Sequence, residues 1–341
     1  MPTLKTHGIF FLIMTCATLL LHEWVPPYLP NGGELLTEDW HARTTQAGRI
    51  DIEDGTITLH STSAQVDTGV VQYIAPVVPD TILMLSADAR STAVVAGTKP
   101  WHQARLLLIQ HNGQRNRWDL SIAAISLIGT QPWENHRAYF TVAPDTQNIR
   151  VMAELSHATG SLQLKNIHLV PVSENPAYFW IQSGLLVSWS ILFLLLLGTC
   201  LSISGHTFLK RLTLALAFAT IVIGTTLPGK IKNQISEEVT AQIHADDQSF
   251  KAILPWDLSK VWHVVVFFLL GLTLKATLKQ SWFIHLIILI LLATGTELAQ
   301  LFISNRSPLI TDSLIDVAGG LGGLMLMTLF LRIKQREKSM H

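Results

Sequence analysis

The uneven distribution of apolar residues constrains this chain more than any other feature of its sequence. Long apolar runs occupy both ends, whereas the stretch from Pro26 to Pro176 has the mixed composition of a soluble domain. Hydrophobic residues make up 49% and charged residues 14% of the 341 residues, against a usual charged share of roughly 25%. We therefore expect a membrane protein with one domain outside the bilayer.

Charge and cysteine content exclude several other classes. The 24 basic and 24 acidic residues balance, so a basic nucleic-acid binder is excluded, and the high apolar content excludes a disordered chain. Cys16 and Cys200 both lie in apolar runs. A disulfide-stapled fold or a cysteine-ligated zinc site is therefore not expected.

Six segments are predicted to cross the membrane. The first, Gly8–Leu21 extended to Val25, is interpreted as an uncleaved anchor, with a signal peptide as the alternative. The other five are Tyr178–Ile203, Leu212–Leu227, Val261–Leu278, Trp282–Ile303 and Leu314–Ile333. The predicted domains are thus an anchor over residues 1–25, a domain outside the cytoplasm over 26–176 and a helical bundle over 177–341.

Basic residues predict the orientation of these segments. If every segment crosses, the basic residues beside them fall on one side of the membrane: Lys5, Lys210, Arg211, Lys275, Lys279 and the cluster from Arg332 to Lys338. Because short cytoplasmic loops carry an excess of Lys and Arg, that side is the cytoplasm. Both termini are then cytoplasmic, and residues 26–176 are periplasmic in a bacterium whose inner membrane holds the protein.

The region between the apolar ends is predicted to be an all-β sandwich. Apolar and polar residues alternate in Thr56–His60 and Asn148–Ala153, which is typical of strands with one buried face. Asp54-Gly55 and Thr68-Gly69 are interpreted as turns between strands. About 145 residues of short strands suffice for two sheets around one core.

The stretch Ala143–Val172 resembles the closing strands of carbohydrate-binding modules, which are jelly-roll sandwiches. An exposed tryptophan ring would pack on the C–H face of a sugar. Four tryptophans are candidates, and the favoured interpretation is that most of them lie in the core: Trp40, Trp101, Trp118 and Trp133. No set of Asp, Glu and His residues in this region has a spacing that indicates catalysis.

Polar residues in the membrane half are predicted to form a pocket that opens outward. An Asp, Lys or Arg at the centre of a span costs about 2.5–3.5 kcal/mol, so such residues pair or face water. Seven polar residues map to one level near the outer surface of the membrane: Lys260, His263, Glu297, Gln300, Arg306, Asp312 and Asp316. Their i, i+3 and i, i+4 spacing places each pair on one helix face. Gly319 and Gly323 continue one such face and predict close helix packing.

These residues as a set resemble the VanZ-like family. The pattern is Lys260-x-x-His263, Glu297-x-x-Gln300, Arg306 and Asp312-x-x-x-Asp316-x-x-Gly319-x-x-x-Gly323, within Leu212–Phe330. The family is named for a membrane protein that raises resistance to the glycopeptide teicoplanin. The resemblance implies an envelope location rather than a particular reaction. The family usually has Asn at the position of Asp316, where this chain adds a negative charge.

Three roles for the polar residues remain open at this point. Lys260 and Arg306 can pair with the carboxylates of three helices and lock their ends. Lys260, His263 and Arg306 can instead bind a phosphate or carboxylate. In an enzyme, His263 would act as a general base beside Glu297 or Asp312, or these residues with Asp316 would hold a divalent metal.

The favoured function is a VanZ-like protein of the bacterial envelope that binds surface glycan or lipid-linked precursors and affects susceptibility to glycopeptides. The alternative is a membrane-embedded hydrolase or transferase acting on the same molecules. The sequence predicts the lipid bilayer and a lipid-linked or polysaccharide ligand as partners. It predicts no nucleic acid, cofactor or bound metal, and it indicates no protein partner.

Overall fold

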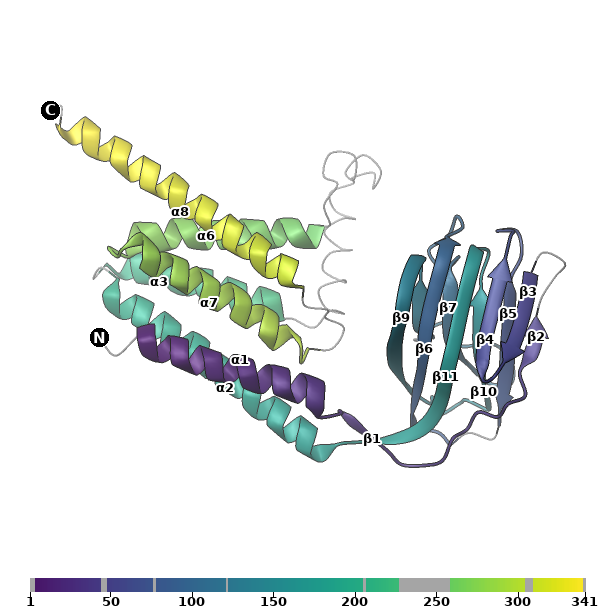
Figure 1. The fold of residues 1–341 in the computed structure, drawn as a ribbon. Coiled ribbons are helices and arrows are strands. Elements are labelled where there is room, and N and C mark those ends of the chain that lie inside the picture. Colours follow the sequence, from purple (N-terminus) through teal and green to yellow (C-terminus); the bar gives the residue numbers. More distant parts are fainter. Residues whose placement is uncertain are drawn as a thin grey trace. The chain divides into compact units, whose positions relative to one another are not determined.

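The computed structural model describes residues 4–43, 48–75, 78–120, 122–204, 207–226, 258–303 and 309–339. The chain divides into two compact units. One comprises Met1–Pro26 with Pro176–His341 and is helical, and the other comprises Pro27–Asn175 and is built of strands (Figure 1). The strand unit is therefore inserted between the first two helices of the helical unit.

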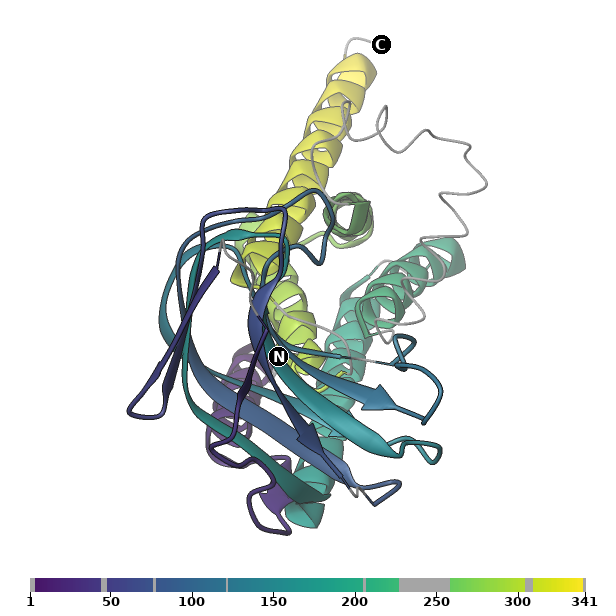
Figure 2. The ribbon, with the colours of Figure 1, turned by 90° about the vertical axis from the view of Figure 1, so that its right-hand side faces the viewer.

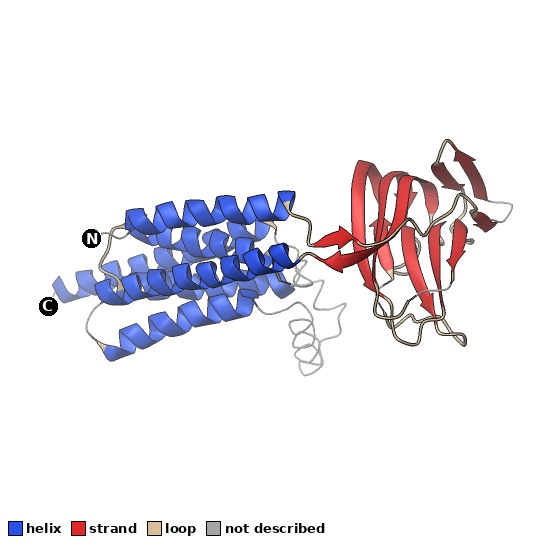
Figure 3. Cartoon of the chain, turned by 90° about the horizontal axis from the view of Figure 1, so that it is seen from below, coloured by secondary structure: helices blue, strands red, loops and turns tan. Residues whose placement is uncertain are grey.

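The described helices lie side by side in the helical unit (Figure 3). They are α1 (Leu4–Trp24), α2 (Pro176–Ile203), α3 (Phe208–Thr226), α6 (Leu258–Thr277), α7 (Trp282–Gln300) and α8 (Ile310–Ser339). All except α3 are long and apolar enough to cross a membrane, which makes five candidate spans. The sequence predicted a sixth over Leu212–Leu227. Helix α3 covers most of it, but Lys210 and Arg211 lie in its first turn and Leu227 falls outside the described residues.

Large apolar side chains lie both inside and outside this bundle. Trp189, Phe218 and Phe267 are buried in its core, whereas residues such as Leu194 and Phe330 are exposed. Apolar residues all round a helix are expected where lipid replaces water. The indole Nε1 of Trp189 donates a hydrogen bond to Thr18 Oγ1 at 3.0 Å, so the first helix is attached to α2 across 171 residues of sequence.

Two antiparallel sheets form the other unit, and the prediction of an all-β sandwich is confirmed. The strands are β1 (Tyr28–Pro30), β2 (His41–Arg43), β3 (Gly48–Glu53), β4 (Thr56–Ser61), β5 (Thr68–Ile74), β6 (Ile82–Val95), β7 (Ala104–His111), β8 (Ala123–Leu127), β9 (Gly129–Thr141), β10 (Asn148–Leu155) and β11 (Thr159–Glu174). One sheet has the order β3-β4-β11-β6-β9, with β1 paired to β11, and the other has the order β2-β5-β10-β7-β8. The strands can be followed in Figure 2, where this unit faces the viewer.

The alternation in β10 shows how each sheet divides its residues. Ile149, Val151 and Ala153 point into the core between the sheets, whereas Arg150, Met152 and Glu154 occupy the alternate positions on the outward face. The first and last strands also meet, because Tyr28 pairs with Glu174. The chain therefore enters and leaves this unit on neighbouring strands.

One of the two turn predictions holds and the other is wrong. Asp54 and Gly55 have positive φ values of 48° and 71° and join β3 to β4, as a two-residue hairpin requires. Thr68 and Gly69, by contrast, begin β5. A Cβ on Gly69 would lie 2.4 Å from the carbonyl oxygen of Ala153, so glycine at this position allows the neighbouring strand β10 to approach.

Candidate functional site

Three helices bring most of the predicted membrane residues together. His263 lies in the second turn of α6, Glu297 in the last turn of α7 and Asp312 in the first turn of α8. A ring nitrogen of His263 and one carboxylate oxygen from each acid lie within 4.8 Å of one another. Asp316 Oδ1 is 3.0 Å from His263 Nδ1, and Gln300 Nε2 donates to Glu297 Oε1 at 3.3 Å. We call His263, Glu297, Asp312 and Asp316 the bundle cluster.

The two basic residues of the predicted site do not complete it. Lys260 is only partly buried and forms no ion pair with any residue in the described part of the chain. Arg306 lies outside the described residues. An ion-pair network of three carboxylates with Lys260 is therefore not seen, and a role for Arg306 stays a prediction.

Glycines on α8 set the short distances in the bundle cluster. A Cβ on Gly323 would lie 2.1 Å from the carbonyl oxygen of Phe268, and one on Gly319 would lie 2.7 Å from that of Val264. Both carbonyls belong to α6, so the backbones of α6 and α8 are in direct contact. This contact brings His263 of α6 within hydrogen-bonding distance of Asp316 of α8.

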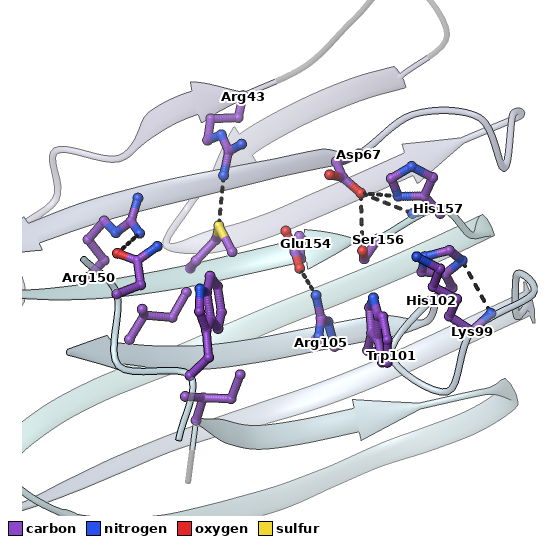
Figure 4. A pocket seen from close by; sticks show the side chains of 15 residues that line it. Arg43, Asp67, Lys99, Trp101, His102, Arg105, Arg150, Glu154, Ser156 and His157 are labelled. Atoms are coloured by element: carbon purple, nitrogen blue, oxygen red, sulfur yellow. Dashed lines mark hydrogen bonds and ion pairs between the residues drawn. The ribbon is translucent and has the colours of Figure 1, made fainter. Parts of the chain in front are cut away.

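A second candidate site lies on the outward face of the sheet β2-β5-β10-β7-β8. It is a groove of about 780 Å³, within the range of about 300–1,000 Å³ that is usual for ligand sites. Figure 4 shows its polar side chains converging from strands and loops far apart in the sequence. The lining residues are Arg43, Asp67, Lys99, Trp101, His102, Arg105, Ile109, Asn116, Trp118, Ile122, Arg150, Met152, Glu154, Ser156 and His157.

An ion pair lies in the middle of this groove. Arg105 on β7 and Glu154 on β10 are direct cross-strand neighbours, and the guanidinium donates to the carboxylate (Figure 4). The two side chains are only 13% and 5% exposed. Burial raises the pKa of Glu154, and the charge of Arg105 opposes that shift. The floor of the groove therefore contains a buried ion pair.

Two exposed tryptophans line the groove. Trp101 and Trp118 are 52% and 59% exposed, so the interpretation that most tryptophans are core residues is wrong for these two. Lys99 Nζ lies 5.3 Å from the Trp101 ring centroid.

The other two candidate tryptophans do not line the groove. Trp40 packs against the core. Trp133, on β9 of the other sheet, lies under Arg90 and Lys165.

Hydrogen bonds hold the residues near Trp101 in place. Asp67 Oδ1 accepts from Ser156 Oγ at 3.1 Å and from the backbone N–H of His157 at 3.1 Å. The same oxygen lies 2.8 Å from His157 Nδ1. The His157 ring stacks on His102 with centroids 4.6 Å apart. The loop that carries Trp101 is thus tied to the end of β10.

The groove carries an excess of positive charge. Four cationic side chains line it against two carboxylates, Asp67 and Glu154. Arg43, Lys99 and Arg150 form no ion pair with a carboxylate in the described ranges. Arg43 donates to Met152 Sδ and Arg150 donates to Asn116 Oδ1. These cations remain available to an anionic ligand.

A pH dependence of the sandwich is expected from His102. Burial, together with the nearby charges of His157 and Lys99, lowers the pKa of His102 from 6.5, and the Lys99 backbone N–H donates to its Nδ1 at 3.4 Å. The unfolded chain therefore takes up this proton first as the pH falls. The sandwich should lose stability below about pH 6.5, until the folded-state pKa is passed.

This expectation is tested by hydrogen–deuterium exchange of β7 peptides in the full-length protein at about pH 7.5 and about pH 5.5, corrected for intrinsic rates. His102→Gln should reduce the loss of protection at low pH. His60→Gln, which changes an exposed histidine on β4, should leave it as in the wild type. Equal losses in wild type and H102Q would exclude His102 as the cause.

Comparison with known proteins identifies the membrane half. The VanZ/LLP1 family model matches residues 226–331. This match includes all seven predicted polar residues as well as Gly319 and Gly323. Together with the five apolar helices, it makes the chain a multi-pass membrane protein with a VanZ-like region. No curated protein matches the chain.

The sandwich is similar to solved carbohydrate-binding modules. One, described as "CBM4 structure and function", is 14% identical over 39% of this chain and 86% of its own, with a TM-score of 0.30. The CBM22-1 xylan-binding domain of Xyn10C from Paenibacillus barcinonensis is 14% identical over 43% and 99%, with a TM-score of 0.30. The N-terminal cellulose-binding domain of Cellulomonas fimi β-1,4-glucanase C is 20% identical over 44% and 98%, with a TM-score of 0.29.

The sequence singled out the residues of the bundle cluster, which lie together in the structure, but it did not single out the groove. The bundle residues stand out because charged groups are rare in apolar segments. The groove residues come from the end of β2, from alternate positions of β7 and β10 and from loops, where polar residues are ordinary. The available signal was the run Lys99-Pro100-Trp101-His102 directly before an apolar strand, together with Trp118 in the next loop.

Proposed function

We propose that this protein is a VanZ-like component of the bacterial envelope that binds an acidic glycan in the groove of its sandwich. One observation carries the proposal, namely that two exposed tryptophans and three cations without carboxylate partners among the described residues line the same groove. A tryptophan face packs on the C–H face of a sugar, and Arg side chains bind carboxylate or phosphate groups through paired N–H donors.

The proposed location depends on the orientation of the membrane segments. If α3 crosses as a sixth segment, the basic residues beside the segments favour cytoplasmic termini, and the sandwich would lie in the periplasm of an inner-membrane protein. Surface glycans and their lipid-linked precursors are the acidic saccharides present there. An effect on glycopeptide susceptibility would result if the bound precursor is also the target of the drug.

The proposal is tested by binding of the full-length protein, purified in detergent, to a set of polysaccharides. Uronate-containing and phosphate-containing glycans should bind more tightly than neutral xylan or cellulose oligomers. The double variant Trp101→Ala, Trp118→Ala should weaken binding at least tenfold, which corresponds to about 1.4 kcal/mol. Trp133→Ala is the matched control, because Trp133 lies on the other sheet.

Two further results would bear on the proposal. Retention of full affinity in the double tryptophan variant would exclude the groove as the binding site. Mass spectrometry of co-purified lipids and glycans, with wild type compared to Trp101→Ala, Trp118→Ala, separates a lipid-linked ligand from a free polysaccharide. The alternative of a membrane enzyme stays a prediction, and turnover by His263 would have to be shown directly.

A further inference from the structure

The bundle cluster has the composition of a metal site. It presents one imidazole and two carboxylates within 4.8 Å of one another, from three different helices. His263 and Glu297 are 5% and 6% exposed, and Asp312 is partly buried. The donor set is therefore held inside the packed bundle.

Buried carboxylate oxygens in the cluster lack partners. Within the described residues, Glu297 Oε2, Asp312 Oδ1 and Asp316 Oδ2 are buried and have no hydrogen-bond partner. Asp316 is fully buried, at 0% exposure. Buried polar atoms without partners are rare because each costs the desolvation of the group. Lys260 forms no ion pair with these carboxylates in the described part of the chain. Within that part, the cluster has the donors for a cation and more carboxylates than paired cations.

We propose that His263, Glu297 and Asp312 bind a divalent transition-metal ion, Zn²⁺ or Mn²⁺, inside the VanZ-like bundle. Mixed imidazole and carboxylate donors favour these ions, whereas Mg²⁺ and Ca²⁺ prefer oxygen donors alone. Metal-to-ligand distances of about 2.0–2.2 Å place ligand atoms about 3–3.5 Å apart. The three donor atoms lie within 4.8 Å of one another, so a bound ion would draw them closer together.

Asp316 has a positioning role in this site. Its Oδ1 lies 3.0 Å from His263 Nδ1, and metal-binding histidines usually give their second ring N–H to a carboxylate or carbonyl. The carboxylate fixes the ring orientation and makes the other nitrogen a better metal ligand. The metal site lies in the helical unit and does not depend on the glycan proposed for the sandwich.

The test measures metal content of the full-length protein in detergent, purified with a tag that contains no histidine. After treatment with a chelator, the protein is dialysed against ZnCl₂, MnCl₂ or MgCl₂, and bound metal is counted by mass spectrometry. Wild type should retain about one Zn²⁺ or Mn²⁺ per chain and no Mg²⁺. Bound metal should also raise the thermal melting temperature, because it binds only the folded state.

Isosteric variants keep the test independent of folding. Glu297→Gln and Asp312→Asn should lower metal affinity at least about tenfold, and Asp316→Asn should lower it about 10- to 100-fold through the ring orientation. His285→Ala is the matched control: it removes another buried histidine, whose Nδ1 lies 2.8 Å from the Ser281 carbonyl oxygen at the opposite end of α7. It should bind as wild type does.

Two outcomes would overturn the proposal. One is that the wild-type protein binds no more metal than Glu297→Gln does, while gel filtration and thermal melting show that both proteins are folded. The other is Glu297→Gln or Asp312→Asn that melts higher than wild type whether or not metal is added. Either result would assign the cluster to carboxyl groups that share protons rather than to a bound cation.

Discussion

Gly323→Ala is expected to destabilise the helical bundle by about 3 kcal/mol, the upper part of the usual range for overpacking. The new Cβ would lie 2.1 Å from the carbonyl oxygen of Phe268 and 2.8 Å from the backbone nitrogen of Leu272. Neither backbone atom can rotate away, as the end of a flexible side chain can. The helices α6 and α8 would have to separate. We expect a lower melting temperature of the full-length protein in detergent, measured by dye binding.

Gly322→Ala provides the matched control for this variant. A Cβ on Gly322 would meet only the Phe268 side chain, at 3.5 Å, which is an ordinary contact. Alanine also favours the helix by about 1 kcal/mol over glycine. Gly322→Ala should therefore melt at or above the wild-type temperature. If both variants melt together, the close approach of α6 and α8 is not what limits the stability of the bundle.

Arg105→Met is expected to destabilise the sandwich by about 3–5 kcal/mol, the usual cost of leaving one member of a buried pair without its partner. The carboxylate of Glu154 is 5% exposed and would have to ionise without its ion-pair partner. Because burial raises the pKa of Glu154 in the folded state, the folded protein holds this proton more tightly. The loss of stability in Arg105→Met should consequently grow as the pH rises above the pKa of this carboxyl in the unfolded chain, which is about 4.3.

A double variant and a surface variant separate the causes. Arg105→Met with Glu154→Leu removes both charges beside the apolar Leu107 and Met152 and should recover most of the lost stability. Arg49→Met breaks a pair whose side chains are 75% and 37% exposed, so its effect should stay within about 0.5 kcal/mol. Hydrogen exchange of β7 and β10 in the full-length protein reports each change. Failure of the double variant to recover would point to lost packing rather than to the unpaired charge.

Local sequence patterns were sufficient to predict most of the helices and several of the strands. The long apolar runs predicted the five described helices that can span a membrane. Period-two alternation predicted strands such as Thr56–His60, which lies within β4. Thr68-Gly69 was misread because glycine can serve a turn or a close approach of two strands. Only the position of Ala153 in β10 distinguishes the two.

Partners far apart in the sequence could not be predicted. Depth in the membrane placed His263 and Asp316 at one level, but their hydrogen bond depends on how α6 and α8 pack. Arg105 and Glu154 are 49 residues apart and meet only because β7 and β10 are neighbours. Pairing of Lys260 with the carboxylates of the bundle cluster was one of three roles left open by the sequence, yet a partly exposed lysine near a helix end reaches water at little cost.

The pairing of Tyr28 with Glu174 affects how easily the strand unit can be replaced during evolution. Both connections to the sandwich leave from adjacent strands, while Trp189 and Thr18 fasten α1 to α2. An inserted module with neighbouring ends can be exchanged for another without stretching the scaffold that receives it. The strand unit could therefore be replaced by another domain without a change in the helices that flank it.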